Sequence, residues 1–203
     1  MPGHEFFRNL GLFVRANFLD PELCLRIIEQ MRQAESRKAL IEGGNPDREI
    51  LDESKRKVLM SVHLSKSTKV LIRDQIMALK PSVEEHFGVS LEDIEKPAFL
   101  RYGEGAFYTP HLDTHSGAST GMAKRRISVV TFLNASSAEP AANCYGGGSL
   151  TFYGLLKGQE WEKCAFGLEA ESGLLIAFRP DILHEVRPIT FGERFTIVSW
   201  FTS

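Results

Sequence analysis

Two histidines and an aspartate lie within the eight residues YTPHLDTH, from Tyr108 to His115. In an extended strand, residues i and i+2 point to the same face. His111 and Asp113 can therefore direct an imidazole and a carboxylate toward one point, while Leu112 is expected to face away into the core. A single H-x-D pattern is weak evidence for a metal site. The candidate for the third ligand that such a site needs is His184, in the segment DILHEV.

Two histidines and one carboxylate bind one face of an octahedral ion and leave the opposite positions open, which is the arrangement of non-heme Fe(II) oxygenases. A structural zinc site is instead closed, tetrahedral and usually rich in thiolates. The three cysteines, Cys24, Cys144 and Cys164, are widely spaced and form no C-x-x-C pattern. The donor types therefore favour iron, and a zinc hydrolase that uses the same three side chains is an alternative.

Arg194 begins the strand-like segment RFTIVSWF. The strand period of two predicts that one face carries Arg194, Thr196, Val198 and Trp200, and the other carries Phe195, Ile197 and Phe201. A guanidinium among apolar neighbours is costly unless it is paired, so an inward Arg194 predicts a bound anion. Arginine binds a carboxylate through two parallel hydrogen bonds. A dicarboxylate could therefore chelate iron at one end and meet Arg194 at the other.

The elements that would position these residues divide the chain into a helical front and a strand-rich back. Residues 12–19 predict a short strand, and the segment after Asp20 predicts an amphipathic helix that this residue caps. A second helical region, interrupted near Pro81, covers residues 67–88. From Pro97 onward, five short runs are rich in β-branched and aromatic residues: KPAFLRYG, RRISVVTFLN, GGSLTFYG, GLLIAFRP and RFTIVSWF. Such runs without helices between them indicate antiparallel strands in a sandwich or barrel.

The length and the net charge of the chain limit the number of domains and the kinds of partner that we expect. We expect the 203 residues to form one domain, in which residues 1–96 are mainly helical support and residues 97–203 form the β core. The 24 basic and 26 acidic side chains are nearly balanced, so we expect neither nucleic acid nor a membrane as partner. The cysteine pattern predicts reduced thiols in a cytoplasmic protein.

Polar and basic segments of the chain are expected at the surface. Residues 42–57 predict a mobile loop, and residues 44–67 could form a lid over an extended substrate. Two basic runs, Lys55–Lys57 and Lys124–Arg126, are expected to be solvated, with contact to an anionic partner as the alternative.

These segments together resemble the iron- and 2-oxoglutarate-dependent dioxygenases, in particular the prolyl 4-hydroxylase-like branch. The matching motifs are RYGEGAFYTPHLD, RRISVVTFLN, GGSLTFY and HEVRPITFGERFTIVSW, which cover roughly the C-terminal half. The resemblance implies a mainly β fold with N-terminal helices, in which the core is a double-stranded β-helix (jelly roll). It also implies that His111, Asp113 and His184 ligate Fe(II) and that Arg194 binds the distal carboxylate of 2-oxoglutarate.

Four further residues receive roles from the same resemblance. Tyr102 hydrogen-bonds the cosubstrate and Thr131 helps to hold it, while Tyr108 and Trp200 line the substrate side. For Tyr102 the alternative is an aromatic that lines the barrel, and for Tyr108 and Trp200 it is a place in the core. For Thr131 the alternative is an ordinary strand position.

Two departures from the family pattern concern Arg194 and His115. The collagen-type prolyl hydroxylases carry lysine where this chain has Arg194. Arginine at this position looks more like the oxygen-sensing prolyl hydroxylases and their bacterial relatives. His115 is an additional imidazole that the motif does not require, and we expect it to lie outside the ligand set or in solvent.

The reaction that the resemblance implies uses Fe(II), 2-oxoglutarate and O2, with ascorbate as a reductant. It converts 2-oxoglutarate to succinate and CO2 and hydroxylates an unactivated C–H bond. Asp113 favours hydroxylation over halogenation, because halogenating relatives carry a small residue there. The expected substrate is a prolyl or other residue in a protein or peptide. A free amino acid as substrate and a non-catalytic jelly-roll binding module are the alternatives.

Overall fold

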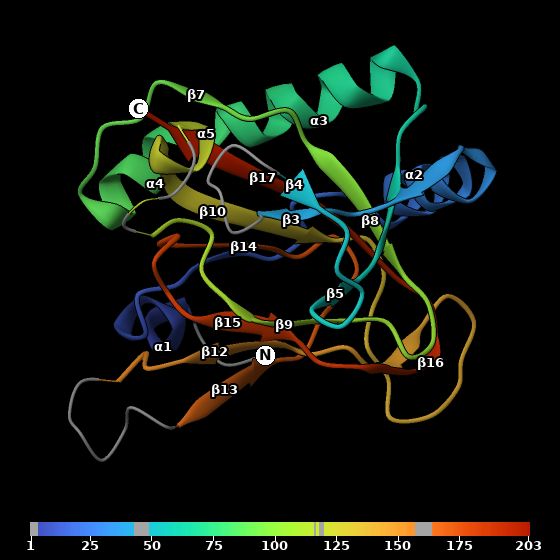
Figure 1. Ribbon diagram of the computed structural model, residues 1–203. Helices are drawn as coiled ribbons and strands as arrows, with labels where there is room; N and C mark the ends of the chain where they lie inside the picture. Colours follow the sequence, from blue (N-terminus) through green and yellow to red (C-terminus); the bar gives the residue numbers. More distant parts are fainter. Residues whose placement is uncertain (1–3, 43–48, 116, 118–119, 157–163) are drawn as a thin grey trace.

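The computed structural model describes residues 4–42, 49–115, 117, 120–156 and 164–203. It consists of two antiparallel sheets that lie one above the other, and the helices between residues 21 and 87 pack against the outer side of the larger sheet (Figure 1). The helices are α1 His4–Asn9, α2 Pro21–Gln33, α3 Lys66–Ala78, α4 Lys80–Phe87 and α5 Thr120–Ala123. None of the helices in the described residues is long and apolar enough to span a membrane.

The larger sheet has the strand order β1-β14-β10-β17-β8-β6-β2, and β7 pairs with β17 beside this path. Its strands are β1 Phe13–Arg15, β2 Ser36–Lys38, β6 Leu59–Ser61, β7 Asp93–Ile94, β8 Ala98–Tyr102, β10 Arg125–Phe132, β14 Leu175–Phe178 and β17 Arg194–Thr202. Every pair in this sheet is antiparallel, as the sequence predicted. The long strands β10 and β17 lie at its centre.

The smaller sheet has the order β13-β12-β15-β9-β5. Its strands are β5 Arg56–Lys57, β9 Phe107–His111, β12 Leu150–Tyr153, β13 Ala165–Leu168 and β15 His184–Val186. Two short pairs complete the fold, β3 Ile41–Glu42 with β4 Glu49–Ile50, and β11 Tyr145–Gly147 with β16 Ile189–Gly192.

Helices α2, α3 and α4 pack on the face of the larger sheet that is turned away from the smaller one. Helix α1 instead contacts the smaller sheet, where Phe6 and Phe7 meet Phe166 of β13. Helix α2 begins at Asp20, whose carboxylate accepts a hydrogen bond from the Leu23 amide at 3.0 Å. The buried face of α2 joins one apolar cluster with β17, whose contribution is Phe195, Ile197 and Phe201. The opposite face of β17 is turned toward the smaller sheet. The alternation predicted for residues 194–201 is therefore confirmed.

The N-terminal half was predicted to be mainly helical support, but it also contributes strands to the sheets. Strand β1 pairs with β14, β6 pairs with β8, and β5 pairs with β9, so residues before Pro97 extend both sheets. The prediction of a loop over residues 42–57 is wrong for β4 and β5, because backbone hydrogen bonds hold these residues in strands. Residues 43–48 of the predicted loop, of which 44–48 also belong to the predicted lid, lie outside the described residues.

Candidate active site

Cross-strand pairing brings the two predicted histidines together. His111 is the last residue of β9 and His184 the first residue of β15, and the two residues are direct partners in the antiparallel register. Asp113 follows two residues after β9 ends. One ligand atom from each of the three side chains lies within 4.8 Å of the others, so this cluster could hold a metal ion. Residues far apart in the sequence thus converge as predicted.

The position of Asp113 differs from the sequence prediction in one respect. The residue lies in a turn and not in a strand, and its amide donates a hydrogen bond to the Pro180 carbonyl at 2.8 Å. Leu112 was expected to face the core. It is instead half-buried and lines the cavity, because the strand alternation stops at His111.

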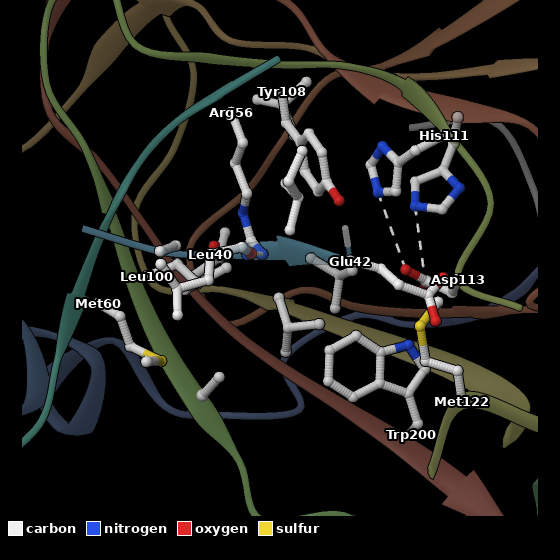
Figure 2. A pocket seen from close by; sticks show the side chains of 18 of the residues that line it. Leu40, Glu42, Arg56, Met60, Leu100, Tyr108, His111, Asp113, Met122 and Trp200 are labelled. Atoms are coloured by element: carbon white, nitrogen blue, oxygen red, sulfur yellow. Dashed lines mark hydrogen bonds and ion pairs between the residues drawn. The ribbon is translucent and has the colours of Figure 1, made fainter. Parts of the chain in front are cut away.

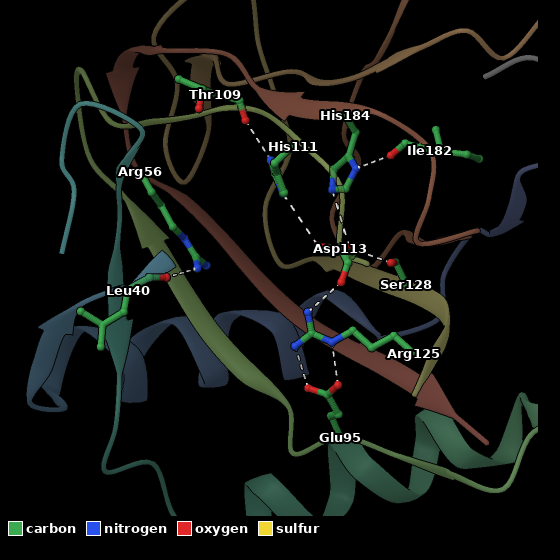
Figure 3. A network of polar contacts seen from close by, with 10 residues as sticks. All are labelled: Leu40, Arg56, Glu95, Thr109, His111, Asp113, Arg125, Ser128, Ile182 and His184. Carbon is green, nitrogen blue, oxygen red and sulfur yellow. Dashed lines mark hydrogen bonds and ion pairs between the residues drawn. The ribbon is translucent and has the colours of Figure 1, made fainter. Parts of the chain in front are cut away.

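Both imidazoles are oriented by backbone carbonyls (Figure 3). Nδ1 of His111 donates to the Thr109 carbonyl at 2.8 Å, and Nδ1 of His184 donates to the Ile182 carbonyl at 2.8 Å. The two Nε2 atoms face the Asp113 carboxylate at 3.8 Å and 3.7 Å. With the proton held on Nδ1, each Nε2 presents a lone pair to the space beside Asp113.

The protonation states of this cluster suit a cation. Burial, together with the nearby His184, lowers the pKa of His111 from 6.5 to about 3. Burial alone would raise the pKa of Asp113, but His184, His111 and the Ser128 hydroxyl lower it below its usual 3.8. His111 is therefore neutral and Asp113 ionised at neutral pH.

A polar network that the sequence did not predict supports Asp113 (Figure 3). The Ser128 hydroxyl donates to Oδ2 of Asp113 at 2.6 Å, and Arg125 donates from Nη1 to its backbone carbonyl at 3.2 Å. Two further bonds, of 2.6 Å and 2.9 Å, join Arg125 to Glu95. The Arg125 guanidinium also lies 3.6 Å from the ring centroid of Trp200. Arg125 belongs to a basic run predicted to be solvated, and for this residue the prediction is wrong.

Aromatic side chains enclose the two histidines. The Tyr108 ring stacks on His111 with ring centroids 3.5 Å apart and an interplanar angle of 17°. Burial raises the pKa of Tyr108 to about 12, so its hydroxyl is neutral at physiological pH. Phe178 meets His184 edge-on, with ring centroids 4.8 Å apart. These contacts restrict the rotation of both imidazoles.

Arg194 is 1% exposed and forms no ion pair with any residue that the structure describes. Its guanidinium lies 4.9 Å from the ring centroid of Tyr102, its cross-strand partner, and its buried Nε has no hydrogen-bond acceptor. Tyr145, which the sequence did not predict, lies beside this guanidinium: burial raises the pKa of the Tyr145 hydroxyl, and the Arg194 charge partly offsets the rise. Gly148 has a φ of +60°, and an added Cβ would lie 2.3 Å from Ile189, so a side chain there would crowd this corner.

One cavity of about 920 Å³ joins these groups (Figure 2). The His-Asp-His cluster, Arg194 and the predicted residues Tyr102, Tyr108 and Trp200 all line it. Two nitrogens and one oxygen suit Fe(II), and a buried guanidinium without an anionic partner suits a carboxylate. The residues present therefore fit Fe(II) and a dicarboxylate such as 2-oxoglutarate.

Two other predicted residues lie apart from this arrangement. Thr131 does not line the cavity. It lies between Val130 and Phe132, which face the smaller sheet, and so it points to the helix side of β10. The structure contradicts its predicted contact with the cosubstrate. His115 is exposed, as expected, and lies 2.8 Å from Oε2 of Glu42, outside the ligand cluster.

Comparison with known sequences identifies the family. The family model described as the 2OG-Fe(II) oxygenase superfamily matches residues 97–202, just over half of the chain. Over 108 residues the chain is 32% identical to a PKHD-type hydroxylase from Shewanella oneidensis. This aligned region covers 53% of this chain and 42% of that protein. A PKHD-type hydroxylase from Shewanella sp. strain ANA-3 has the same identity and coverage. The match thus spans less than half the length of these relatives.

Solved structures share the fold at low identity. A prolyl-4-hydroxylase from Pseudomonas putida superposes with a TM-score of 0.69 and 24% identity, over 98% of this chain and 95% of that one. A Trichoplax adhaerens prolyl hydroxylase was solved with a peptide fragment of hypoxia inducible factor. It superposes with a TM-score of 0.69 and 16% identity, over 98% of this chain and 86% of that one. The chain belongs to the 2OG-Fe(II) oxygenase superfamily and has a fold like that of its prolyl 4-hydroxylases.

Proposed function

We propose that this protein is an Fe(II)- and 2-oxoglutarate-dependent dioxygenase that hydroxylates an unactivated C–H bond. His111, Asp113 and His184 hold Fe(II), and Arg194 binds the distal carboxylate of 2-oxoglutarate. The observation that carries the proposal is a buried arginine that has no anionic partner among the described residues and lies in the same cavity as the His-Asp-His cluster. A zinc hydrolase with the same three ligands would give this arginine no role.

When bound, iron and 2-oxoglutarate supply the oxidising chemistry, which consumes O2, releases succinate and CO2 and adds a hydroxyl group to the substrate. The chain orients and encloses the reactants. The carbonyls of Thr109 and Ile182 keep both Nε2 atoms directed at the metal position. Tyr102 and Tyr145 flank the Arg194 guanidinium and orient it toward the cosubstrate. In this proposal the two facing sheets form a double-stranded β-helix.

The proposed substrate is a prolyl or other residue in a protein or peptide. The cavity volume of about 920 Å³ lies at the upper end of the range for small-molecule sites and leaves space beyond a five-carbon cosubstrate. Tyr108 and Trp200 form the walls of this space. Related proteins are named as hydroxylases, and one prolyl hydroxylase of similar fold was solved with a peptide. A free amino acid is the alternative substrate. Ascorbate as reductant and a cytoplasmic location are further parts of the proposal.

Anaerobic titration with Fe(II) and then 2-oxoglutarate tests the cofactor assignment. We expect a weak visible charge-transfer band when the 1-carboxylate and 2-oxo group chelate the metal. His184→Ala should lose both iron and the band, whereas His115→Ala, which alters the additional imidazole outside the cluster, should keep both. Stoichiometric iron without a band in the wild-type protein would contradict the assignment.

A second experiment tests the substrate class. The protein is incubated aerobically with cell extract, Fe(II) and 2-oxoglutarate, and both the peptides and the small molecules are analysed by mass spectrometry. We expect peptides whose mass increases by one oxygen atom, and none when His184→Ala replaces the wild-type protein. Oxidation of a free amino acid without any modified peptide would instead support the small-molecule alternative.

A further inference from the structure

Arg56 is another arginine in the wall of the cavity. It lies on β5, which pairs with β9 so that Arg56 is opposite Tyr108. The sequence places it in a basic run, Lys55–Lys57, that was predicted to be solvated. Lys55 and Lys57 are exposed, but Arg56 is half-buried and lines the cavity. The prediction of a solvated residue is therefore wrong for Arg56.

The Arg56 guanidinium is held in place but has no anionic partner among the residues that the structure describes. Nη1 donates to the Leu40 carbonyl at 2.8 Å, and the guanidinium carbon lies 4.6 Å from the Tyr108 ring centroid (Figure 2). The Nε atom is buried without a hydrogen-bond acceptor, and Arg56 forms no ion pair within the described part of the chain. Glu42 lines the same cavity, but its carboxylate lies 2.8 Å from His115. An arginine carries five N–H donors, and most of those of Arg56 are unused.

This positive charge lies close to the proposed metal site. Figure 2 shows the Tyr108 ring between Arg56 and His111, and the Tyr108 and His111 centroids are 3.5 Å apart. Arg194 belongs to a different wall, on β17 beside Tyr102. Arg56 therefore still has no assigned anion after the cosubstrate carboxylate has been assigned to Arg194.

We propose that Arg56 is a specificity-determining residue that binds a carboxylate of the substrate while the carbon to be oxidised lies beside the metal. This inference rests on the proposed dioxygenase function. A guanidinium pairs with a carboxylate through charge-assisted, often bidentate hydrogen bonds, and the half-buried setting limits competition from water. The carboxylate belongs to an acidic side chain of a peptide or to the main-chain carboxylate of a free amino acid. The two sources share the same chemistry at Arg56.

Matched acid and amide probes test this subsite and distinguish the two sources. The peptide pair is N-acetyl-Ala-Pro-Asp-Ala-amide and its asparagine counterpart, and the amino acid pair is L-proline and L-prolinamide. Binding to the protein loaded with Fe(II) and 2-oxoglutarate is measured under nitrogen by calorimetry, so the readout does not depend on turnover. Succinate formation in air provides a second readout.

We expect the acid of at least one pair to bind about tenfold or more tightly than its amide in the wild-type protein. Arg56→Gln should abolish this preference for the acid, and Arg56→Lys should retain part of it. Lys57→Gln is the matched control, because Lys57 lies on the same strand, is exposed and does not line the cavity. A preference within the peptide pair identifies an acidic peptide as substrate, and one within the proline pair identifies a free amino acid.

The outcomes separate this inference from the proposed function. The charge-transfer band is recorded in every sample first, and its absence in the wild-type protein would refute the dioxygenase assignment itself. If the band is intact, three results would refute the subsite alone. These are equal affinity for acid and amide, no binding of any probe, and a preference for the acid that persists in Arg56→Gln. Loss of the band only in Arg56→Gln would show that Arg56 supports the metal site and would also overturn the subsite.

Discussion

The phenol ring of Tyr108 lies parallel to the imidazole of His111, with ring centroids 3.5 Å apart. The two residues are three positions apart on β9, and Arg56 covers the other side of the Tyr108 ring. This stack fixes the plane of the imidazole, while the hydrogen bond to Thr109 fixes its tautomer. One short strand thus provides both a proposed ligand and the side chain that orients it.

Tyr108→Leu should weaken iron binding by about threefold to tenfold, because an aromatic stack contributes about 0.5–1.5 kcal/mol beyond the burial of its area. Tyr108→Phe keeps the stacked ring and should retain the wild-type affinity. The dissociation constant for Fe(II), measured anaerobically by competition with a chromophoric chelator, is the readout. Equal affinities for the leucine and phenylalanine variants would show that the stack does not orient His111.

Ser128→Ala removes the hydroxyl that donates to Oδ2 of Asp113 at 2.6 Å. Outer partners of metal ligands typically account for 10-fold to 100-fold in metal affinity, so we expect a loss of about that size. Ser199→Ala is the control, because Ser199 is equally buried but donates to the Glu95 carbonyl and does not touch Asp113. A loss of the same size in both variants would indicate general destabilisation and not an effect on the carboxylate.

Arg194→Ala should raise the apparent KM for 2-oxoglutarate well over tenfold, since loss of a desolvated ion pair costs about 2–5 kcal/mol. The metal should still bind, because Arg194 is not a member of the His-Asp-His cluster. The measurement is succinate formation against 2-oxoglutarate concentration, with Arg187→Ala as the control at an arginine that is half-exposed and paired with Glu185. An unchanged KM in Arg194→Ala would show that another group binds the carboxylate.

The metal-free protein should lose stability as the pH falls below about 6.5. Because burial and His184 lower the pKa of His111 from 6.5 to about 3, the unfolded chain binds a proton between these values that the folded chain does not bind. The free energy of unfolding therefore falls with pH in this window, by at most about 1.4 kcal/mol per pH unit for one group. The lowered pKa of Asp113 acts in the same direction below pH 3.8.

Urea unfolding of the metal-free protein at several pH values between 7 and 4 measures this loss of stability. The dependence should be shallower in His111→Asn, which cannot bind the proton in either state. His63→Asn removes an exposed histidine outside the cluster and is the control for loss of an imidazole elsewhere in the chain. Identical curves for His111→Asn and the wild-type protein would contradict the assigned shift.

Several features could be predicted because they depend on local period and chemistry. The alternation of Arg194 to Phe201 assigned one face of β17 to the cavity and the other to the helices, and both assignments are confirmed. The meeting of His111 and His184 could be expected from their chemistry, but their direct cross-strand register could not. The register depends on pairing between strands that are distant in sequence, and a local sequence pattern does not determine this pairing.

The errors have a common origin in tertiary contacts. Asp113 reaches the cluster through a turn anchored on Pro180, which no strand pattern predicts. Arg56 and Arg125 were expected in solvent because each lies in a basic run, yet each has its charged group against an aromatic ring. Thr131 was placed by motif alone, and the strand alternation directs it to the opposite side of β10.

The pairing of β1, β5 and β6 with later strands has a consequence for how the protein can be divided. A fragment limited to residues 97–202, the region of the family match, would leave β14, β9 and β8 each with a row of unpaired amides and carbonyls. Exposed edges of this kind recruit further chains, so such a fragment would self-associate instead of forming a portable catalytic module. Chimeras that exchange substrate preference between relatives should therefore transplant the early strands together with the later strands that they pair with.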